Sequence, residues 1–506
     1  MAQNRATPVE ETLDPADWEA MRALGHRMVD DMLDYLATVR DRPVWQHAPT
    51  EVRAHFDAPI PLDPQPPEEV YGEFLERVLP YPVGNTHPRF WAWIFGTGTV
   101  LGALAELLAA TMNVGASGGL AYHSANYVEK QVLDWFKEML GFPPSASGLL
   151  TSGCSAANLI GLAVARNAQA GYDLRRQGLG AAPDKMVLYA SQEIHSSIQK
   201  AVELLGLGSD ALRQVPVDDN FQIDLGALQA AIAQDRRDGH QPFCVVGAAG
   251  TTNTGAVDDL EALARICAQE DLWLHVDGAF GAWAALAPGT RDLVAGMERA
   301  DSLAFDLHKW MYMPYEIGCV LVQHEPDHRH AFSLTPDYLA HGEGERGLAG
   351  RDLPWLPDYG FQLSRSFRAL KAWMSLKEHG VQKYGRLIQQ NVDQALYLAR
   401  LVEAAPELEL AAPVVLNVVC FRYGNAALAA SAGPAALDEL NKQIEVQLQE
   451  EGVAAVSGTV IRGRYVLHLA NCNHRSRRED FDTLVREVIR IGNELSHPFP
   501  PSPRKL

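Results

Sequence analysis

A lysine, an aspartate and a histidine each stand shortly after an apolar run in this sequence. Lys309 follows the run at 302–305, Asp277 the run at 272–276, and His195 the run at 186–190. A lysine withdrawn from water loses its proton more readily and can then attack a carbonyl carbon. A carboxylate at the end of a buried strand needs an ion-pair or hydrogen-bond partner, because burying it without one is energetically costly. These residue types suit carbonyl chemistry. The structural alternatives are that Lys309 extends its charged end to solvent and that Asp277 or His195 caps a helix.

A turn rich in small residues, TSGCSAAN at 151–158, precedes an apolar helical pattern. Small side chains let backbone N–H groups approach an anion, and a helix N-terminus adds a favourable dipole. Many helices begin this way, so the turn is weak evidence by itself. Together with Lys309, Asp277 and His195 it completes the set needed to hold pyridoxal 5′-phosphate (PLP). The turn would bind the phosphate, the acid would keep the ring nitrogen protonated, the histidine would stack on the ring, and the lysine would bind the aldehyde.

The middle of the chain alternates apolar runs with helical patterns. The runs lie at 186–190, 243–249, 272–276, 302–305 and 317–322, and the helical patterns between them include 196–205, 225–234 and 258–269. Nearly continuous apolar strands separated by helices are typical of an α/β protein whose mostly parallel sheet is covered on both faces. Ligands of such sheets bind at the carboxyl ends of the strands, which is where Lys309 and Asp277 are expected.

An amphipathic helix is predicted over 14–36, before the α/β region. Asp14 can cap its free amides and Pro15 suits the first helical position. Its apolar side chains recur at steps of three and four, at Met21, Leu24, Met28, Met32 and Tyr35. This stripe must pack on a part of the chain distant in sequence or on a second subunit.

The patterns divide the chain into three regions. Residues 1–99 are expected to form an N-terminal helical segment, 100–375 a large PLP-binding domain, and 376–506 a small C-terminal α+β domain. Within the large domain, 324–355 is rich in Gly, His and charge and lacks clear periodicity, which is typical of a lid or a disordered loop. Helical patterning resumes over about 366–401.

Composition excludes several classes of protein. The 506 residues carry a net charge of −20, which argues against binding nucleic acid or anionic lipid. Six scattered cysteines show no metal-ligand spacing, so we expect neither a metal site nor disulfides, and reduced thiols fit a reducing compartment. The polar N-terminus does not resemble a signal peptide, and no apolar run reaches the roughly 18 residues of a membrane span. We expect a cytoplasmic protein.

With these motifs in place, the sequence resembles the PLP-dependent group II amino-acid decarboxylases, and within them the aromatic-L-amino-acid decarboxylases. The resemblance runs over nearly the whole chain, from about 14 to about 490. Its most specific stretches, in order, are HPRFWAW (87–93), TSGCSAANL (151–159), IHSSIQKA (194–201), GTTNTGAVDD (250–259), LHVDGAFG (274–281), DLHKW (306–310), PDYLAH (336–341) and SRSFRALKAW (364–373).

The resemblance implies PLP-dependent fold type I and a homodimer with active sites at the subunit interface, the N-terminal segment wrapping over the partner. Lys309 would be the Schiff-base lysine, Asp277 would pair with the pyridine nitrogen, and His195 would stack on the ring. Ala279 would lie against the other ring face and Thr252 near cofactor and substrate. The residues implied at the phosphate are Cys154, Ser155 and His308.

Three further positions bear on the reaction that the resemblance implies. Tyr338, on the predicted loop, matches the tyrosine that returns a proton to Cα; related aldehyde synthases carry Phe there and divert the reaction to oxidative deamination. Asp306 stands where many family members have Asn, and a carboxylate would be repelled by the phosphate unless protonated or turned away. Cys154 stands where Ala or Gly is common, but its backbone N–H can still serve.

The predicted substrate wall is aromatic, with Trp91, Trp93 and Phe95 from HPRFWAWIFG. An acidic substrate would call for a pocket arginine, and Arg89 looks structural beside Pro88. In plant relatives the position of Ser364 carries Gly for indolic and Ser for phenolic substrates. The expected reaction is decarboxylation of an aromatic L-amino acid of the Tyr, Dopa, Trp or Phe type. The alternatives are another amino-acid decarboxylase, an aromatic aldehyde synthase, or a PLP-binding partner subunit without turnover.

Overall fold

The computed structural model describes residues 11–116, 123–334, 353–424 and 433–496. The chain divides into two compact units, Met1–Arg42 with His47–Pro82, and Pro43–Gln46 with Val83–Leu506. Within the described ranges, none of the helices combines the length and the apolar character that crossing a membrane requires.

The first unit is helical, with α1 (Trp18–Ala37), α2 (Thr50–His55) and α3 (Pro67–Glu73). The predicted N-cap of its first helix was wrong. Asp17 caps α1, because its Oδ1 accepts hydrogen bonds from the backbone N–H groups of Glu19 at 2.9 Å and Ala20 at 3.0 Å. Asp14 and Pro15 lie before the helix, where Asp14 is too far along the chain to reach these amides.

The second unit contains a seven-stranded sheet in the order β1-β7-β6-β5-β4-β2-β3. Its strands are β1 (Ser147–Thr151), β2 (Lys185–Ser191), β3 (Leu212–Val215), β4 (His240–Ala248), β5 (Trp273–Asp277), β6 (Ser302–Asp306) and β7 (Gly318–Val322). The run from β6 through β5, β4 and β2 to β3 is parallel, whereas β7 is antiparallel to both β6 and β1. The five predicted strands are present; β1 and β3 were not predicted.

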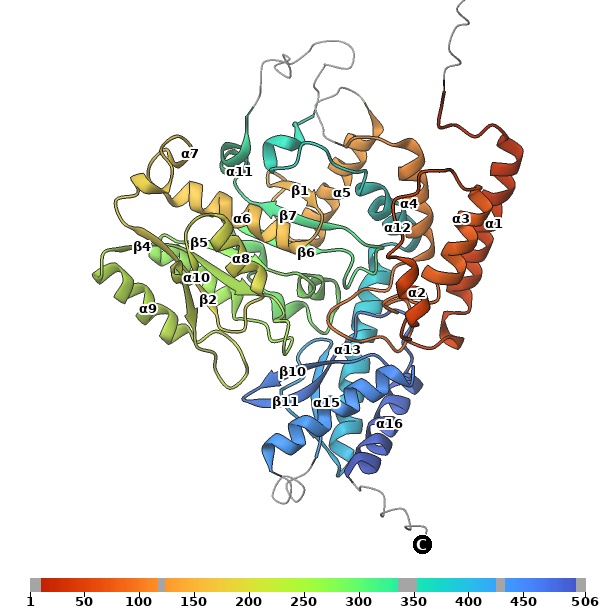
Figure 1. Ribbon diagram of the computed structural model, residues 1–506. Coiled ribbons are helices and arrows are strands. Elements are labelled where there is room, and N and C mark those ends of the chain that lie inside the picture. Colours follow the sequence, from red (N-terminus) through yellow and green to blue (C-terminus); the bar gives the residue numbers. More distant parts are fainter. Residues whose placement is uncertain (1–10, 117–122, 335–352, 425–432, 497–506) are drawn as a thin grey trace, which may run out of the picture. The chain divides into compact units, whose positions relative to one another are not determined.

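Helices cover both faces of this sheet, as Figure 1 shows. An apolar cluster on one face joins the sheet to α6 (Cys154–Gln169) and α8 (Ser196–Leu204). A cluster on the other face joins it to α5 (Ser124–Leu140), α9 (Leu225–Arg237) and α10 (Leu260–Glu270). The prediction of a mostly parallel, doubly covered sheet is confirmed.

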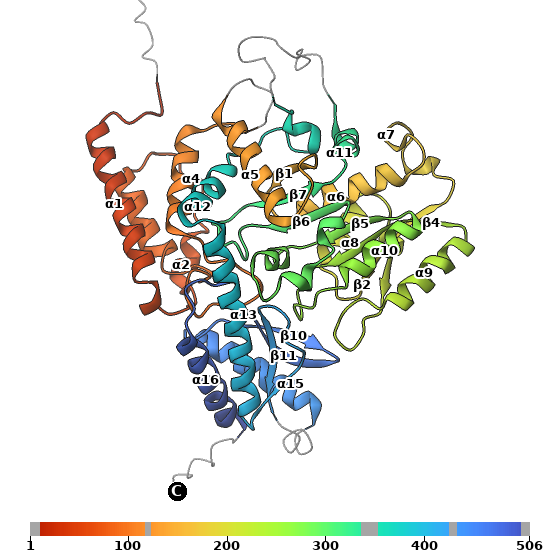
Figure 2. The same ribbon diagram turned by 180° about the vertical axis from the view of Figure 1, so that it is seen from behind.

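A smaller antiparallel sheet follows in the order β10-β11-β9-β8. Its strands are β8 (Leu408–Leu410), β9 (Val418–Tyr423), β10 (Ser457–Ile461) and β11 (Arg464–Ala470), and α13 (Val381–Ala404), α15 (Pro434–Glu450) and α16 (Arg478–Ser496) pack on it. Figure 2 shows α13 running from the large sheet's helices to this smaller layer. The C-terminal region is therefore α+β, as predicted.

Two stretches between the sheets differ from the expected patterns. The start of the predicted loop at 324–355 forms a helix, α11 (Glu325–Phe332), and 335–352 lie outside the described residues. The helical pattern at 366–401 divides into α12 (Ala369–His379) and α13 at Gly380, whose φ of +69° suits glycine. Among the described residues, the remaining α-helices of this unit are α4 (Val100–Met112) and α7 (Leu174–Gln177).

Candidate active site

The carboxyl ends of β5 and β6 bring Asp277 and Asp306 to one edge of the large sheet. Parallel pairing sets Asp277 opposite Ala304 of β6, and Asp306 ends that strand two residues later. Lys309 follows in the turn after β6. The first turn of α6, beginning at Cys154, comes to the same edge because β1 and its antiparallel partner β7 carry it there.

Four of the predicted site residues make direct contact at this edge. The Asp306 carboxylate accepts a 2.6 Å hydrogen bond from the Cys154 backbone N–H and lies 3.0 Å from the Lys309 Nζ. The Cys154 thiol donates to the Asp277 carboxylate at 3.4 Å. The two acids and Cys154 are buried, and the Lys309 side chain is 19% exposed. Residues more than 150 positions apart thus form one charged cluster.

The protonation of Lys309 differs from the sequence-based expectation. Burial is the largest single influence and lowers the pKa of this amine, as expected, but Asp306, Cys154 and Asp277 together outweigh burial and the pKa of Lys309 is raised. The expectation that desolvation frees the amine was therefore wrong for the structure as it stands. A buried lysine keeps its proton when a carboxylate lies in contact with it.

A cavity of about 230 Å³ opens beside this cluster. Seven predicted residues are among those that line it; the lining includes Trp93, Ile94, Phe95, Glu193, His195, Thr252, Asp277, Ala279, Phe280 and Lys309. The residues present fit PLP, since an amine, an acid, an imidazole and a small alanine all face one hollow at the end of a 16-residue helix.

The remaining predicted residues are distributed as follows. His308 is buried, with its Nε2 3.6 Å from the Asp306 carboxylate, and Ser155 is an exposed residue of the first turn of α6. Ser364 is exposed and does not line the cavity. Tyr338 lies outside the described residues.

The structure separates the two tryptophans of the predicted substrate wall. Trp93 lines the cavity, whereas Trp91 is 1% exposed and belongs to the core of the small sheet. The Trp91 indole stacks on Phe481 and donates to the Ser476 hydroxyl at 3.0 Å. Phe280, which was not predicted, completes the wall; its place in the motif LHVDGAFG was the available signal.

A buried hydrogen-bond chain behind Asp277 was also not predicted. The Asn158 amide N–H₂ donates to the Asp277 carboxylate at 3.1 Å and to the Ser197 hydroxyl at 3.0 Å. The Asn158 carbonyl oxygen can only accept, so His275 Nε2, 2.9 Å away, carries a proton. Burial lowers the pKa of His275 to about 4, so this ring is neutral and its Nδ1 accepts from Ser302, 2.8 Å away.

The same chain sets the proton position on His195. The backbone N–H of Ser197 donates to His195 Nδ1 at 3.2 Å, so that nitrogen is an acceptor and also receives the Ser197 hydroxyl proton. Desolvation lowers the pKa of His195. Its Nε2 therefore carries the proton, and Asn158 orients both Asp277 and His195 from behind the cavity.

Asn158→Ala is expected to weaken PLP binding on the order of tenfold. The substitution leaves buried donors and acceptors without partners, a loss of about 1–3 kcal/mol, and frees Asp277 to turn. Quenching of tryptophan fluorescence on PLP addition measures the affinity. Asn167→Ala, further along the same helix and partly exposed, is the control; equal affinities for the two variants would contradict the positioning role.

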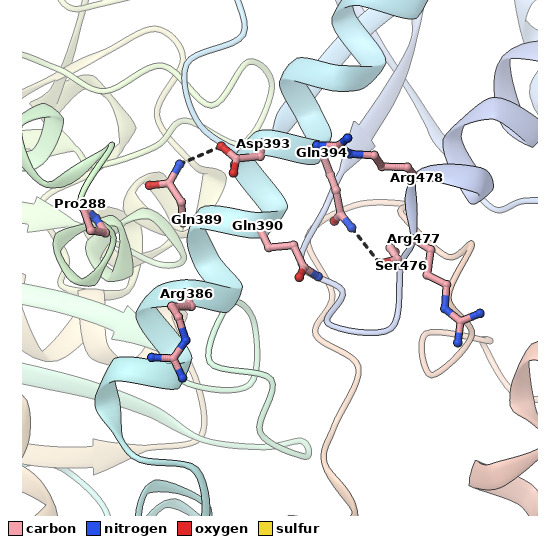
Figure 3. A pocket seen from close by; sticks show the side chains of 9 residues that line it. All are labelled: Pro288, Arg386, Gln389, Gln390, Asp393, Gln394, Ser476, Arg477 and Arg478. Carbon is pink, nitrogen blue, oxygen red and sulfur yellow. Dashed lines mark hydrogen bonds between the residues drawn. The ribbon is translucent and has the colours of Figure 1, made fainter.

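A larger cavity of about 520 Å³ lies elsewhere, between α13 and the segment that leads into α16 (Figure 3). Arg386, Arg477 and Arg478 contribute to its lining, and Gln394 bonds the Ser476 carbonyl there. None of the predicted site residues lines it. The smaller cavity beside Lys309 is therefore the candidate active site.

Known proteins are similar to this chain over most of its length. The pyridoxal-dependent decarboxylase conserved domain matches residues 49–424. The chain is 34% identical to the aromatic-L-amino-acid decarboxylase of Bacillus atrophaeus, over 95% of this chain and 97% of that one. It is 29% identical to the phenylacetaldehyde synthase of Arabidopsis thaliana, over 90% and 93%. A solved structure of Oryza sativa TDC with PLP and tryptamine superposes with a TM-score of 0.88 at 27% identity, covering 96% of this chain and all of that one.

Proposed function

Since this chain belongs to the pyridoxal-dependent decarboxylase family, we propose that it converts an aromatic L-amino acid to the corresponding amine and CO₂. One observation carries the proposal: Lys309 and Asp277 face a single cavity whose wall is made of Trp93, Phe95 and Phe280. The amine and the acid serve the cofactor, and the aromatic wall suits the substrate side chain.

The residues around the cavity would divide the work of holding PLP. Lys309 would bind the aldehyde carbon, Asp277 would hold a proton on the ring nitrogen, and His195 would stack on the ring. Ala279 and Thr252 line the space for the ring and the substrate. Cys154, Ser155 and His308 would serve the phosphate at the start of α6. When bound, PLP supplies a π-system that accepts the electron pair left when CO₂ departs.

The protein's own contribution is to orient charges and protons. Three hydrogen bonds, from Asn158, Cys154 and the Ala279 backbone N–H, hold the Asp277 carboxylate in one orientation. A carboxylate fixed in this way stabilises a proton on a facing pyridine nitrogen without reorganising during the reaction. Tyr338 would then return a proton from its phenol oxygen to the substrate's Cα, with its loop excluding water.

The charge of the cavity favours an aromatic over an acidic substrate. Of the described residues that line it, Lys309 is the cation and carries the cofactor role, while Glu193 adds a negative charge. A glutamate or aspartate side chain would need a second cation to grip its carboxylate. Arg89 does not supply one, because it donates to the Val453 carbonyl at 2.7 Å, away from the cavity.

A substrate screen tests the proposal. Purified protein with PLP is incubated with each of the common amino acids, Dopa and 5-hydroxytryptophan, and CO₂ and amine are measured. We expect kcat/KM for the aromatic substrates to exceed that for glutamate by a factor of about 100 or more, the scale of one buried ionic mismatch. Absence of CO₂ from every aromatic substrate would refute it.

Tyr338→Phe is expected to divert product from amine to aldehyde, because the phenol that reprotonates Cα is gone. The expected result is a several-fold lower amine yield, with hydrogen peroxide and ammonia released in step with the aldehyde. Product analysis by chromatography measures the ratio. An unchanged product would show that another acid delivers this proton, and aldehyde from the unmodified enzyme would favour the aldehyde synthase alternative.

We also propose a homodimer whose interface includes the active site. Apolar side chains of α4 support it, since Leu107, Leu108 and Met112 are about half exposed. Light scattering should give twice the 55.4 kDa chain mass. The proposed compartment is the cytoplasm, which suits the six cysteines, all of them unpaired and buried.

A further inference from the structure

Asp306 is held firmly at the end of β6. Its backbone N–H donates to the Ala279 carbonyl at 2.9 Å, and its own carbonyl accepts from the Trp283 indole N–H at 2.8 Å. The residue is 2% exposed. The surrounding backbone therefore determines where the Asp306 carboxylate can lie.

The two oxygens of this carboxylate contact two different groups. Oδ1 accepts from the Cys154 backbone N–H at 2.6 Å, and Oδ2 lies 3.0 Å from the Lys309 Nζ. Close packing against glycine encloses the arrangement, because a β-carbon at Gly318 would come within 2.7 Å of Asp306 Oδ1. The contacts are thus part of a built site rather than a surface ion pair.

These two partners are the groups that PLP needs under the proposed function, on which this inference rests. The amide at the start of α6 suits the phosphate, and the Lys309 amine must bind the aldehyde. We propose that Asp306 is a placeholder anion, whose carboxylate occupies both groups in the cofactor-free protein and so slows and weakens cofactor loading. A neutral side chain of the same shape at this position would load PLP faster and hold it more tightly.

Few neighbouring charges can offset the repulsion between this carboxylate and a phosphate. Among the described residues, the titratable groups that interact with it include Cys154, His195, His308, Lys309 and Tyr315. Burial lowers the pKa values of the two histidines and raises those of Cys154 and Tyr315, so these four are neutral at physiological pH. Among the described residues, Lys309 is the cation in contact with Asp306, and loading requires its amine to bond with the aldehyde.

Release of Lys309 adds a second barrier. Only the free amine attacks a carbonyl carbon, so Lys309 must first give its proton to water. The nitrogen–carbon bond then forms and the carbonyl oxygen leaves as water, with no change of oxidation state. Asp306 opposes the first event because it stabilises the ammonium form.

Asp306→Asn tests the proposal directly. Cofactor is removed from the wild type and the variant with hydroxylamine, and PLP association is followed by stopped-flow absorbance. The variant should bind PLP about tenfold faster than the wild type. Its dissociation constant for PLP should also be lower than that of the wild type. With pyridoxal, which lacks the phosphate, the gain should be smaller. Asp301→Asn is the matched control, because Asp301 precedes β6 and its carboxylate accepts from the Leu274 N–H instead.

Thermal unfolding supplies a readout that a purely structural residue would not give. The raised pKa of Lys309 means that the ion pair stabilises the cofactor-free fold below the ordinary lysine pKa, and this stabilisation is lost only as pH rises through the raised value. At neutral pH, Asp306→Asn should therefore lower the Tm of the cofactor-free protein. Adding PLP should increase the Tm of the variant by more than it increases the Tm of the wild type. If the variant shows both a lower cofactor-free Tm and a smaller increase in Tm on PLP addition, the proposal is overturned.

The wild type offers a measurement that needs no variant. The groups that face Lys309 are Cys154, His195, Asp277, Asp306, His308, Tyr315 and Cys472. The shifts resolved for the thiols, the imidazoles and the phenol keep these groups neutral from about pH 7 to about pH 9. The association rate should rise close to tenfold per pH unit over this range, and a plateau would overturn the proposal. If borohydride fails to fix PLP to Lys309 in the wild type, the proposed function itself fails; if it fixes PLP there and Asp306→Asn loads no faster, this inference alone fails.

Discussion

Lys309→Ala is expected to abolish decarboxylation, with kcat reduced by about 10⁴-fold or more, the scale seen when a covalent catalytic group is removed. The alanine cannot bind the aldehyde, so the visible absorbance of the protein-bound cofactor should also disappear. CO₂ release and an absorbance spectrum after gel filtration measure the two effects. Retained turnover would exclude Lys309 as the cofactor-binding residue.

Two companion variants separate the chemistry of Lys309 from its ion pair with Asp306. Lys309→Arg keeps a cation beside the carboxylate but cannot load PLP, so it should be inactive with a cofactor-free Tm near that of the wild type. Lys309→Ala leaves the Asp306 carboxylate buried without its cation, a loss on the order of 3 kcal/mol, and should lower that Tm. Lys200→Ala, at an exposed position on α8, is the control for general effects.

Asp277→Asn is expected to lower kcat on the order of 10³-fold, with a smaller loss of PLP affinity. The amide keeps the size of the side chain but carries no negative charge to hold a proton on the ring nitrogen, so the ring accepts electrons poorly. Steady-state kinetics and PLP titration measure the two losses. The unequal effect on kcat and affinity separates a chemical role from simple cofactor retention.

Asp277→Ala should show the larger loss of affinity, because it also deprives Asn158 and the Ala279 N–H of their acceptor. Asp259→Asn, which alters only the cap of α10, is the control. Near-normal rates in both Asp277 variants would mean that another group serves the ring nitrogen.

Most of the secondary structure around the site could be predicted from local patterns. Strands β5 and β6 are fully buried apolar runs that end at Asp277 and Asp306, and α8 and α10 begin within two residues of the predicted positions. Burial on both faces imposes this composition on each strand separately, so the signal is local. The same regularity placed Asp277 and Lys309 at the carboxyl ends of the strands.

Local sequence patterns could not distinguish which of two neighbouring residues of the same type lines the cavity. Trp91 and Trp93 have the same type and nearly the same place, yet one enters the core around Phe481 and the other lines the cavity. Trp93 has a φ of +53°, so the chain there leaves the regular alternation that would have placed both tryptophans on the same face. Contacts with the small sheet, hundreds of residues later, decide the outcome.

The sequence by itself determined the fold class, the edge of the sheet where chemistry is possible, and the types of side chain placed there, because each follows from composition and periodicity within a short window. The tertiary structure decided the charge on Lys309 and the orientation of Asp277, since these depend on Asp306 and Asn158 at distances of 3.0 and 3.1 Å. Proton positions respond to contacts of this length, and only the folded chain brings such partners together.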